Sequence, residues 1–173
     1  MMINDIPAET TLTELPDLES RLNPTACDHL RTWLRFQSCN RLIENEIRSR
    51  LRKEFNTTLP RYDLMAHLEK FPKGIKMSDL SRHMMVTNGN ITGITDQLVK
   101  DGYVQRVKLP EDRRSSLLKL TAKGRVHLAE INAAHNEWVC DLFGQLSDQT
   151  VQSMLSSLNE LKMLSHLFTT PNP

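Results

Sequence analysis

The chain has 173 residues, enough to bury the core of one ordinary domain, and its 22 basic and 21 acidic residues nearly cancel. No stretch approaches the roughly 18 consecutive apolar residues of a membrane span, and no secretory signal opens the chain, so we expect a soluble, cytoplasmic protein. The three cysteines are odd in number, widely spaced and without a C-x-x-C pair, which favours reduced thiols over a disulfide framework.

Residues 1–25 form an acidic arm with three prolines, five carboxylates and a single arginine, and we expect it to be loosely ordered. From Thr25 a long helix is expected, because eight residues recur at steps of three or four along one face. These residues are Leu30, Trp33, Phe36, Asn40, Ile43, Ile47, Leu51 and Phe55. Pro60 marks the start of a second helix. The inward side of this helix carries Tyr62, Leu64, Met65 and Leu68.

Two helices separated by a turn are expected next. The motif Pro72-Lys73-Gly74 breaks the second helix, and a short helix follows from about Ser78 to Met85. Thr87 is a candidate N-cap for the helix after it, because its hydroxyl can accept a hydrogen bond from a free amide. Gly102 suits the C′ position of that helix, since glycine tolerates a positive φ. This order predicts a helix-turn-helix.

A β-hairpin and two more helices complete the chain. Alternation over Tyr103 to Leu109 and over Ser116 to Leu120, on either side of a polar turn, predicts the hairpin. Thr121 then caps a helix over 122–145, and Ser147 caps the last helix. Apolar residues along these two helices include Val126, Ala129, Ala133, Trp138, Leu142, Phe143, Val151, Met154, Leu155, Leu158, Leu161, Leu164 and Phe168.

The predicted fold is mainly α with a small β-hairpin wing: a winged helix-turn-helix with N- and C-terminal dimerisation helices. We expect residues 58–121 to form a DNA-binding lobe, and residues 26–57 and 122–168 to supply the dimerisation helices. These helices carry more apolar surface than one small winged domain can cover. Candidate anchors of the interface are Leu158, Leu161 and Leu164. The alternative is a bundle that packs within one chain.

The basic residues gather in the middle of the chain. Between Lys73 and Arg125 there are eleven basic and five acidic residues, a net charge of +6, and the remainder carries −5. Such segregation is an electrostatic footprint for a polyanion, although a merely solvated face would also account for it.

The helix from Thr87 to Asp101 can read the major groove. Ile91, Ile94 and Leu98 share an inward face, and polar residues occupy the other side. Amides and hydroxyls there can bond base edges. Gly89 and Gly93 each cost about 1 kcal/mol relative to alanine within a helix, which makes sense if the backbone must closely approach a partner. The alternative is an ordinary polar surface.

The hairpin tip, Asp112-Arg113-Arg114, supplies a second contact. Arg114 is slim and permanently charged, so it can enter a narrow minor groove, while Asp112 pairs with a nearby arginine and holds the tip in shape. Basic residues of the hairpin stem can meet phosphates. The full predicted DNA-binding set is Asn88, Gly89, Asn90, Thr92, Gln97, Lys100, Arg106, Lys108, Arg113 and Arg114, with Asp112 in support and Lys119 on the stem.

Several motifs occur in order across this region. They are Thr58-Leu59-Pro60-Arg61-Tyr62-Asp63-Leu64, Met77-Ser78-Asp79-Leu80-Ser81, Ile91-Thr92 with Asp96-Gln97-Leu98, Lys100-Asp101-Gly102-Tyr103-Val104, Asp112-Arg113-Arg114 and Leu120-Thr121-Ala122-Lys123-Gly124. Together they resemble the MarR family of winged helix-turn-helix regulators over about residues 28–168. The resemblance implies an obligate homodimer on a pseudo-palindromic operator, usually a repressor released by a small ligand. It also implies that Arg114 is the wing arginine and Asp112 its partner.

Three positions depart from the family pattern. Met85 stands where a turn glycine is frequent, Gly93 where a larger side chain is usual, and Gln97 where an arginine often follows the aspartate. The stretch from Met84 to Gly93 is similar to members that control aromatic-acid catabolism. This similarity implies an aromatic acid or its CoA thioester as effector.

An effector pocket is expected where the dimer helices meet the DNA-reading lobe, so that a bound molecule can bias the spacing of the lobes. The candidate ligand-binding residues are Arg31, Trp33, Arg35, Phe36, Asn40, Tyr62, Met65 and His67. Each is better explained as core or ordinary surface, because aromatic residues at helical spacing usually pack. A carboxylate or phosphate would suit the two arginines.

Other classes of function have weaker support. Cys27 near a helix start is a candidate redox thiol, but it has no evident partner cysteine. Cys27, His29, His67 and His83 lack the spacing of a zinc site, so we expect neither a metal nor a cofactor. An enzyme is not expected, because no phosphate loop, nucleophile elbow or supported carboxylate pair occurs. A protein-binding adaptor on the same scaffold remains an alternative, although it would not need Arg114.

Overall fold

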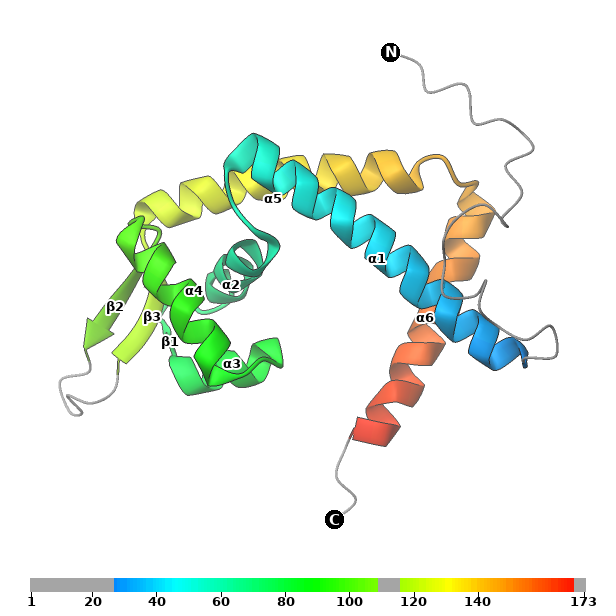
Figure 1. Ribbon diagram of the computed structural model, residues 1–173, viewed down its shortest axis with the longest axis horizontal. Coiled ribbons are helices and arrows are strands. Elements are labelled where there is room, and N and C mark those ends of the chain that lie inside the picture. The colour runs from blue at the N-terminus through cyan, green and yellow to red at the C-terminus, as the bar shows by residue number, and fades with distance from the viewer. Residues whose placement is uncertain (1–26, 109–115, 170–173) are drawn as a thin grey trace. The chain divides into compact units, whose positions relative to one another are not determined.

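The computed structural model describes residues 27–108 and 116–169. Six helices and three strands lie in these ranges (Figure 1). They are α1 (Asp28–Phe55), α2 (Leu59–Glu69), β1 (Ile75–Lys76), α3 (Met77–Met84), α4 (Asn88–Lys100), β2 (Val104–Lys108), β3 (Ser116–Leu120), α5 (Ala122–Phe143) and α6 (Asp148–Thr169). The mainly helical fold with a hairpin wing is confirmed. The acidic arm of residues 1–25 and the wing tip lie outside the described residues.

The chain divides into two compact units, Met1–Leu59 and Pro60–Pro173. The described part of the first unit consists mainly of α1, which begins at Asp28 rather than at Thr25. Two ion pairs at i,i+4 spacing, Glu44–Arg48 and Glu46–Arg50, run along this helix. No helix among the described residues is long and apolar enough to span a bilayer.

The core of the second unit joins helices α2 to α5 to the sheet. Its fully buried side chains are Leu64, Met65, Leu68, Leu80, Ile91, Thr95, Leu98, Val104, Leu118, Leu128 and Ile131. Each large aliphatic side chain buried in this way contributes about 1.5–3 kcal/mol of transfer free energy. The inward residues predicted for α2 and α4 are therefore largely confirmed, with Tyr62 and Ile94 half-buried.

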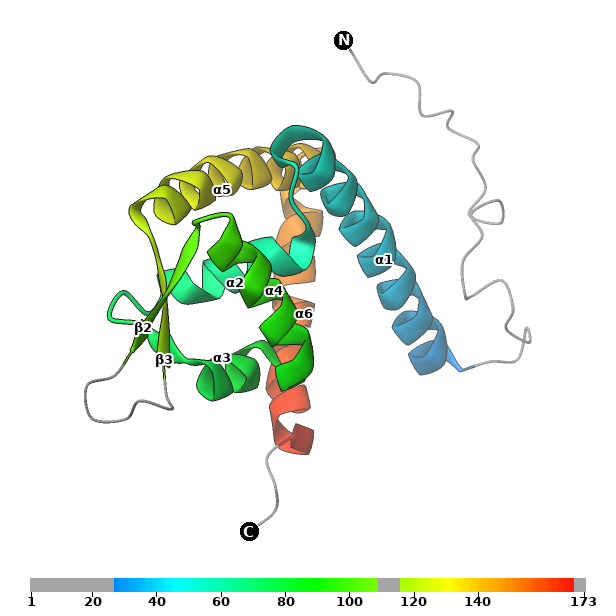
Figure 2. The ribbon, with the colours of Figure 1, turned by 60° about the vertical axis from the view of Figure 1, so that its left-hand side comes forward.

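The sheet is antiparallel, in the order β1-β3-β2. In the hairpin Val104 pairs with Leu120 and Lys108 with Ser116. Strands β2 and β3 lie side by side, and α5 continues from the end of β3 (Figures 1 and 2). Strand β1 was not predicted, because Ile75-Lys76 is too short to show an alternating pattern. It pairs Ile75 with Leu118 and so attaches the α2–α3 connection to the wing.

The turn from α4 into β2 has the geometry of a Schellman motif. The Gly102 N–H donates to the Val99 carbonyl over 3.0 Å, and the Tyr103 N–H donates to the Leu98 carbonyl over 2.9 Å. Gly102 has φ +77°, which favours glycine. The predicted C′ role of Gly102 is confirmed.

Thr121 joins the end of the wing to the start of α5. Its Oγ1 accepts from the Gly124 N–H over 2.9 Å and donates to the Gly102 carbonyl over 2.7 Å. Its own N–H donates to the Tyr103 carbonyl over 3.0 Å. The predicted cap of α5 is confirmed, and so is that of α6, where the Thr150 N–H donates to Ser147 Oγ.

One sequence-based prediction needs correction. Thr87 occupies the N-cap position of α4, but its side chain forms no capping hydrogen bond. On α5, Val126 is apolar yet 60% exposed, whereas Leu128, Ile131 and Trp138 are buried. The junction at Gly124 sets the rotation of α5, and it turns the row of residues 124, 128, 131 and 138 inward.

Gly124 allows a close approach between α5 and the wing. A Cβ placed there would lie 2.0 Å from the Tyr103 carbonyl oxygen, which is far inside van der Waals contact. Because the obstacle is backbone, a larger residue would have to displace the helix from the strand. A glycine is required at this position by packing and not by its φ angle.

We predict that Gly124→Ala lowers the free energy of unfolding by about 1–3 kcal/mol, even though alanine favours a helix. Urea denaturation at fixed protein concentration measures the change. Gly93→Ala in α4 is the matched control, since an added Cβ there meets nothing within 4 Å, and it should gain stability. A Gly124→Ala variant as stable as its parent would contradict the packing argument.

Candidate nucleic-acid interface

Helix α4 presents a polar face to solvent. Ile91, Thr95 and Leu98 are buried beneath it. The exposed residues are Gly89, Asn90, Thr92, Gly93, Asp96, Gln97 and Lys100, as the helical wheel predicts. Thr92 Oγ1 also donates to Met77 Sδ of α3 over 3.5 Å. The Asn88 side chain and the tip residues Asp112, Arg113 and Arg114 lie outside the described set.

The two glycines on this face are not required by the fold. A Cβ added at Gly89 or Gly93 would meet nothing within 4 Å, and neither residue has a positive φ. Each costs about 1 kcal/mol of helix propensity relative to alanine. Packing among the described residues therefore does not require glycine at either position.

The turn before α4 contains a non-glycine residue with a positive φ angle. Met85 adopts the left-handed conformation with φ +54° and closes α3, donating its N–H to the Arg82 carbonyl over 3.2 Å. An L-residue in this conformation costs about 1–2 kcal/mol. The Met85 side chain is 93% exposed, so packing within the chain does not offset the strain.

Strand β2, which follows α4, carries two cations. Arg106 and Lys108 are exposed, whereas Lys119 on β3 is half-buried. Arg106 pairs across the sheet with the buried Leu118, and its Nη2 lies 2.5 Å from Asp96 Oδ1 of α4. Arg106 was expected to meet phosphates, and its ion pair with Asp96 was not predicted. No residue pattern signals the pair, since ten residues and a turn separate its members.

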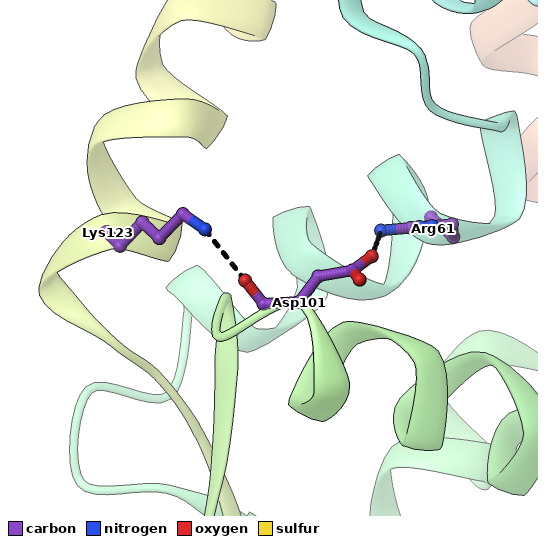
Figure 3. Close-up of polar contacts among 3 residues, drawn as sticks. All are labelled: Arg61, Asp101 and Lys123. Atoms are coloured by element: carbon purple, nitrogen blue, oxygen red, sulfur yellow. Dashed lines mark hydrogen bonds and ion pairs between the residues drawn. The ribbon is translucent and has the colours of Figure 1, made fainter.

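A second charged contact fixes the C-terminal end of α4 (Figure 3). Arg61 of α2 forms an ion pair with the Asp101 carboxylate, and Lys123 Nζ of α5 donates to the Asp101 carbonyl over 2.8 Å. The Lys123 ammonium also lies 4.6 Å from the centre of the Tyr103 ring. These contacts connect the α4–β2 turn to α2 and to α5, and they orient the polar face of α4 relative to the wing.

Two of the predicted ligand-binding residues of α2 have partners within their own unit. The Tyr62 hydroxyl donates to Asn132 Oδ1 over 3.0 Å, and its ring lies 5.4 Å from His135. Burial raises the pKa of Tyr62, and the negative charges of Asp63 and Glu69 add to the shift. His67 Nδ1 donates to the Asp63 carbonyl. Met65 is fully buried in the core.

The candidate ligand residues of α1 lie on an exposed helix. Trp33, Phe36 and Asn40 are exposed, and Arg31 lies 3.9 Å from Asp28. Arg35 is exposed as well. The three cysteines are free and exposed. Within residues 27–108 and 116–169, no three histidine, cysteine, aspartate or glutamate side chains gather as metal ligands.

A helix-turn-helix followed by a hairpin, with an exposed polar helix beside an exposed basic strand, defines a winged helix-turn-helix domain. Residues 57–116, which form this domain, match the model of the MarR family. The MarR-type fold that the sequence motifs implied is thus confirmed.

Known proteins share this domain over part of their length. The HTH-type transcriptional regulator PrsX of Escherichia coli is 34% identical over 90 residues, 52% of this chain and 53% of PrsX. The transcriptional activatory protein BadR of Rhodopseudomonas palustris is 33% identical over 53% of this chain and 55% of BadR. The chain thus spans about half the length of these relatives.

A solved structure is similar in fold over a larger part of the chain. Streptococcus pneumoniae FabT in complex with DNA matches 82% of this chain and 100% of its own, with a TM-score of 0.70 and 24% identity. The similarity of fold therefore reaches well beyond the matched domain.

Proposed function

We propose that the protein is a sequence-specific transcriptional regulator that binds duplex DNA as a homodimer. The observation that carries the proposal is the polar face of α4, whose two open glycines have no use inside the fold. An α-helix fits the major groove of B-DNA, where amides and hydroxyls read the bases. Asn88, Asn90, Thr92, Gln97 and Lys100 supply such groups.

The wing is the second DNA-binding element of the proposal. Arg114 enters the minor groove, Arg113 and Lys108 meet phosphates, and Asp112 holds the tip. The basic segment between Lys73 and Arg125 favours such an arrangement, because its net charge of +6 attracts the phosphate backbone. Because DNA is the proposed partner, we propose that the protein acts in the cytoplasm and has no enzymatic activity.

The proposed dimer uses the helices on either side of the DNA-binding lobe, within residues 26–57 and 122–168. On α6, Leu155, Leu158, Leu161 and Leu164 recur at helical spacing and are exposed. On α1, Leu30, Trp33 and Phe36 are exposed as well. A second copy would cover these side chains, each worth about 1.5–3 kcal/mol on burial. Two copies also place two recognition helices on one operator.

The regulatory signal is the finer part of the proposal. We propose a repressor released by an aromatic acid or its CoA thioester, bound by the candidate residues of α1 and α2. BadR is described as an activator, so the sign of regulation has to be measured. Two alternatives remain: a redox switch at the exposed Cys27, and an adaptor that binds protein instead of DNA.

One prediction from the proposed function concerns the open glycines of α4. Gly93→Ala should weaken operator binding about tenfold, and Gly93→Leu should weaken it further, because each added group separates the backbone from the bases. Neither variant should lower stability by more than a few tenths of a kcal/mol, since leucine and alanine favour helices. Mobility-shift titrations on DNA selected from a random pool, at several salt concentrations, measure affinity.

Wild-type binding should fall steeply as salt rises, because phosphate contacts release counterions. Unchanged affinity in both Gly93 variants would show that the backbone of α4 does not approach the bases. Binding to a protein partner alone, with no duplex binding at low salt, would favour the adaptor.

A second prediction concerns the dimer. Leu158→Asp should weaken self-association by about 2 kcal/mol or more, over tenfold, because it removes buried apolar surface and adds a charge. Sedimentation equilibrium measures the change. Ser156→Asp is the matched control, because it adds the same charge two residues away on another side of α6. Equal effects of both variants would argue against an interface at Leu158.

A third prediction concerns the effector. An aromatic acid or acyl-CoA present at about 100 times its Kd should stabilise the protein by about 2.7 kcal/mol and release DNA over the same concentration range. Thermal denaturation and mobility shifts follow the two effects. Acetate and free CoA serve as controls. Equal effects of the controls would exclude recognition of the aromatic group.

A further inference from the structure

Asp96 is the one acidic residue of α4, Asn88–Lys100, and it lies on the exposed face of the helix. Its Oδ1 is 2.5 Å from Arg106 Nη2 on β2, and the two side chains are 58% and 39% exposed. Among the described residues, Arg106 is the only partner that the Asp96 carboxylate contacts. The ion pair therefore connects the two elements that the proposed function assigns to DNA.

A carboxylate on this face has an electrostatic cost. It repels phosphates, and it cancels the charge of the arginine beside it. Exposed ion pairs of this kind add little to stability, so holding the fold together is a weak reason for its presence. A carboxylate in the major groove can, however, accept a hydrogen bond from the amino group of cytosine.

We propose that Asp96 is a specificity-determining residue, an inference that rests on the proposed DNA-binding function. Asp96 neutralises Arg106, so the pair adds no net positive charge to binding on DNA of arbitrary sequence. Arg106 in turn holds Oδ1 and orients the carboxylate, which leaves Oδ2 to accept from a cytosine N4 amino group at the operator. At an operator with cytosine in this position, the hydrogen bond offsets the repulsion between the Asp96 carboxylate and the phosphates. Other sequences do not offer this hydrogen bond.

The charge part of the proposal is tested with Asp96→Asn on a duplex that lacks the operator. The variant keeps the side-chain shape and an oxygen that can accept from Arg106, but it frees one positive charge. The slope of log K against log salt should steepen by about 0.9 per protomer. The double variant Asp96→Asn with Arg106→Gln restores charge balance, and its slope should return to the wild-type value.

The matched control is Glu46→Gln on α1. It removes an acid from another exposed ion pair, in which Glu46 Oε1 lies 2.7 Å from Arg50 Nε. This variant should leave the slope unchanged. An unchanged slope in Asp96→Asn, or the same change in Glu46→Gln, would overturn the charge part.

The reading part is tested on operator variants in which each C·G pair is replaced in turn by T·A. Wild-type protein should lose about tenfold or more at one position in each half-site, and Asp96→Ala should be insensitive there. Equal sensitivity of the two proteins at every position would overturn the cytosine contact. Wild-type protein that binds no duplex DNA would instead refute the proposed function itself.

Discussion

The angle between the helix α4 and the wing depends on the backbone around Tyr103. The Tyr103 carbonyl accepts from the Thr121 N–H and lies against Gly124, while the Tyr103 N–H closes the end of α4 at the Leu98 carbonyl. The backbone of one residue thus terminates a helix, pairs with the other end of the hairpin and lies against the start of the next helix. Because these contacts are backbone contacts, side-chain motion cannot readily change the angle that they set.

Charged contacts around this junction restrain the polar face of α4 without making it basic. Arg61 and Lys123 both bind Asp101, and Arg106 binds Asp96. Individually such contacts stabilise little. Together they hold both the end and the exposed face of α4 in register with α2, α5 and β2. The exposed face keeps mainly neutral donors and acceptors, which are the groups that distinguish base pairs.

Local rules in the sequence predicted much of this arrangement. Gly102 and Thr121 act within a few residues of their own positions, so their roles as C′ glycine and N-cap were correctly predicted. Strand β1 was missed because two residues carry no periodicity and depend on β3 for pairing. The buried side of α5 was not predicted, because it depends on the contact of Gly124 with Tyr103, which only the tertiary structure brings together. The ion pair of Asp96 and Arg106 has the same origin, and the tip residue Arg114 remains a prediction.

Helix α4 has unequal ends. Its C-terminal end is held by the Schellman turn at Gly102 and by the pairing of Asp101 with Arg61. Its first turns lack a side-chain cap from Thr87 and contain Gly89 and Gly93. The C-terminal turn of α4 is therefore held by several contacts, whereas opening its first turns costs less free energy. In the proposed function, a helix built in this way would keep its position while its leading turns adapt to the groove, so the DNA surface would complete part of its structure.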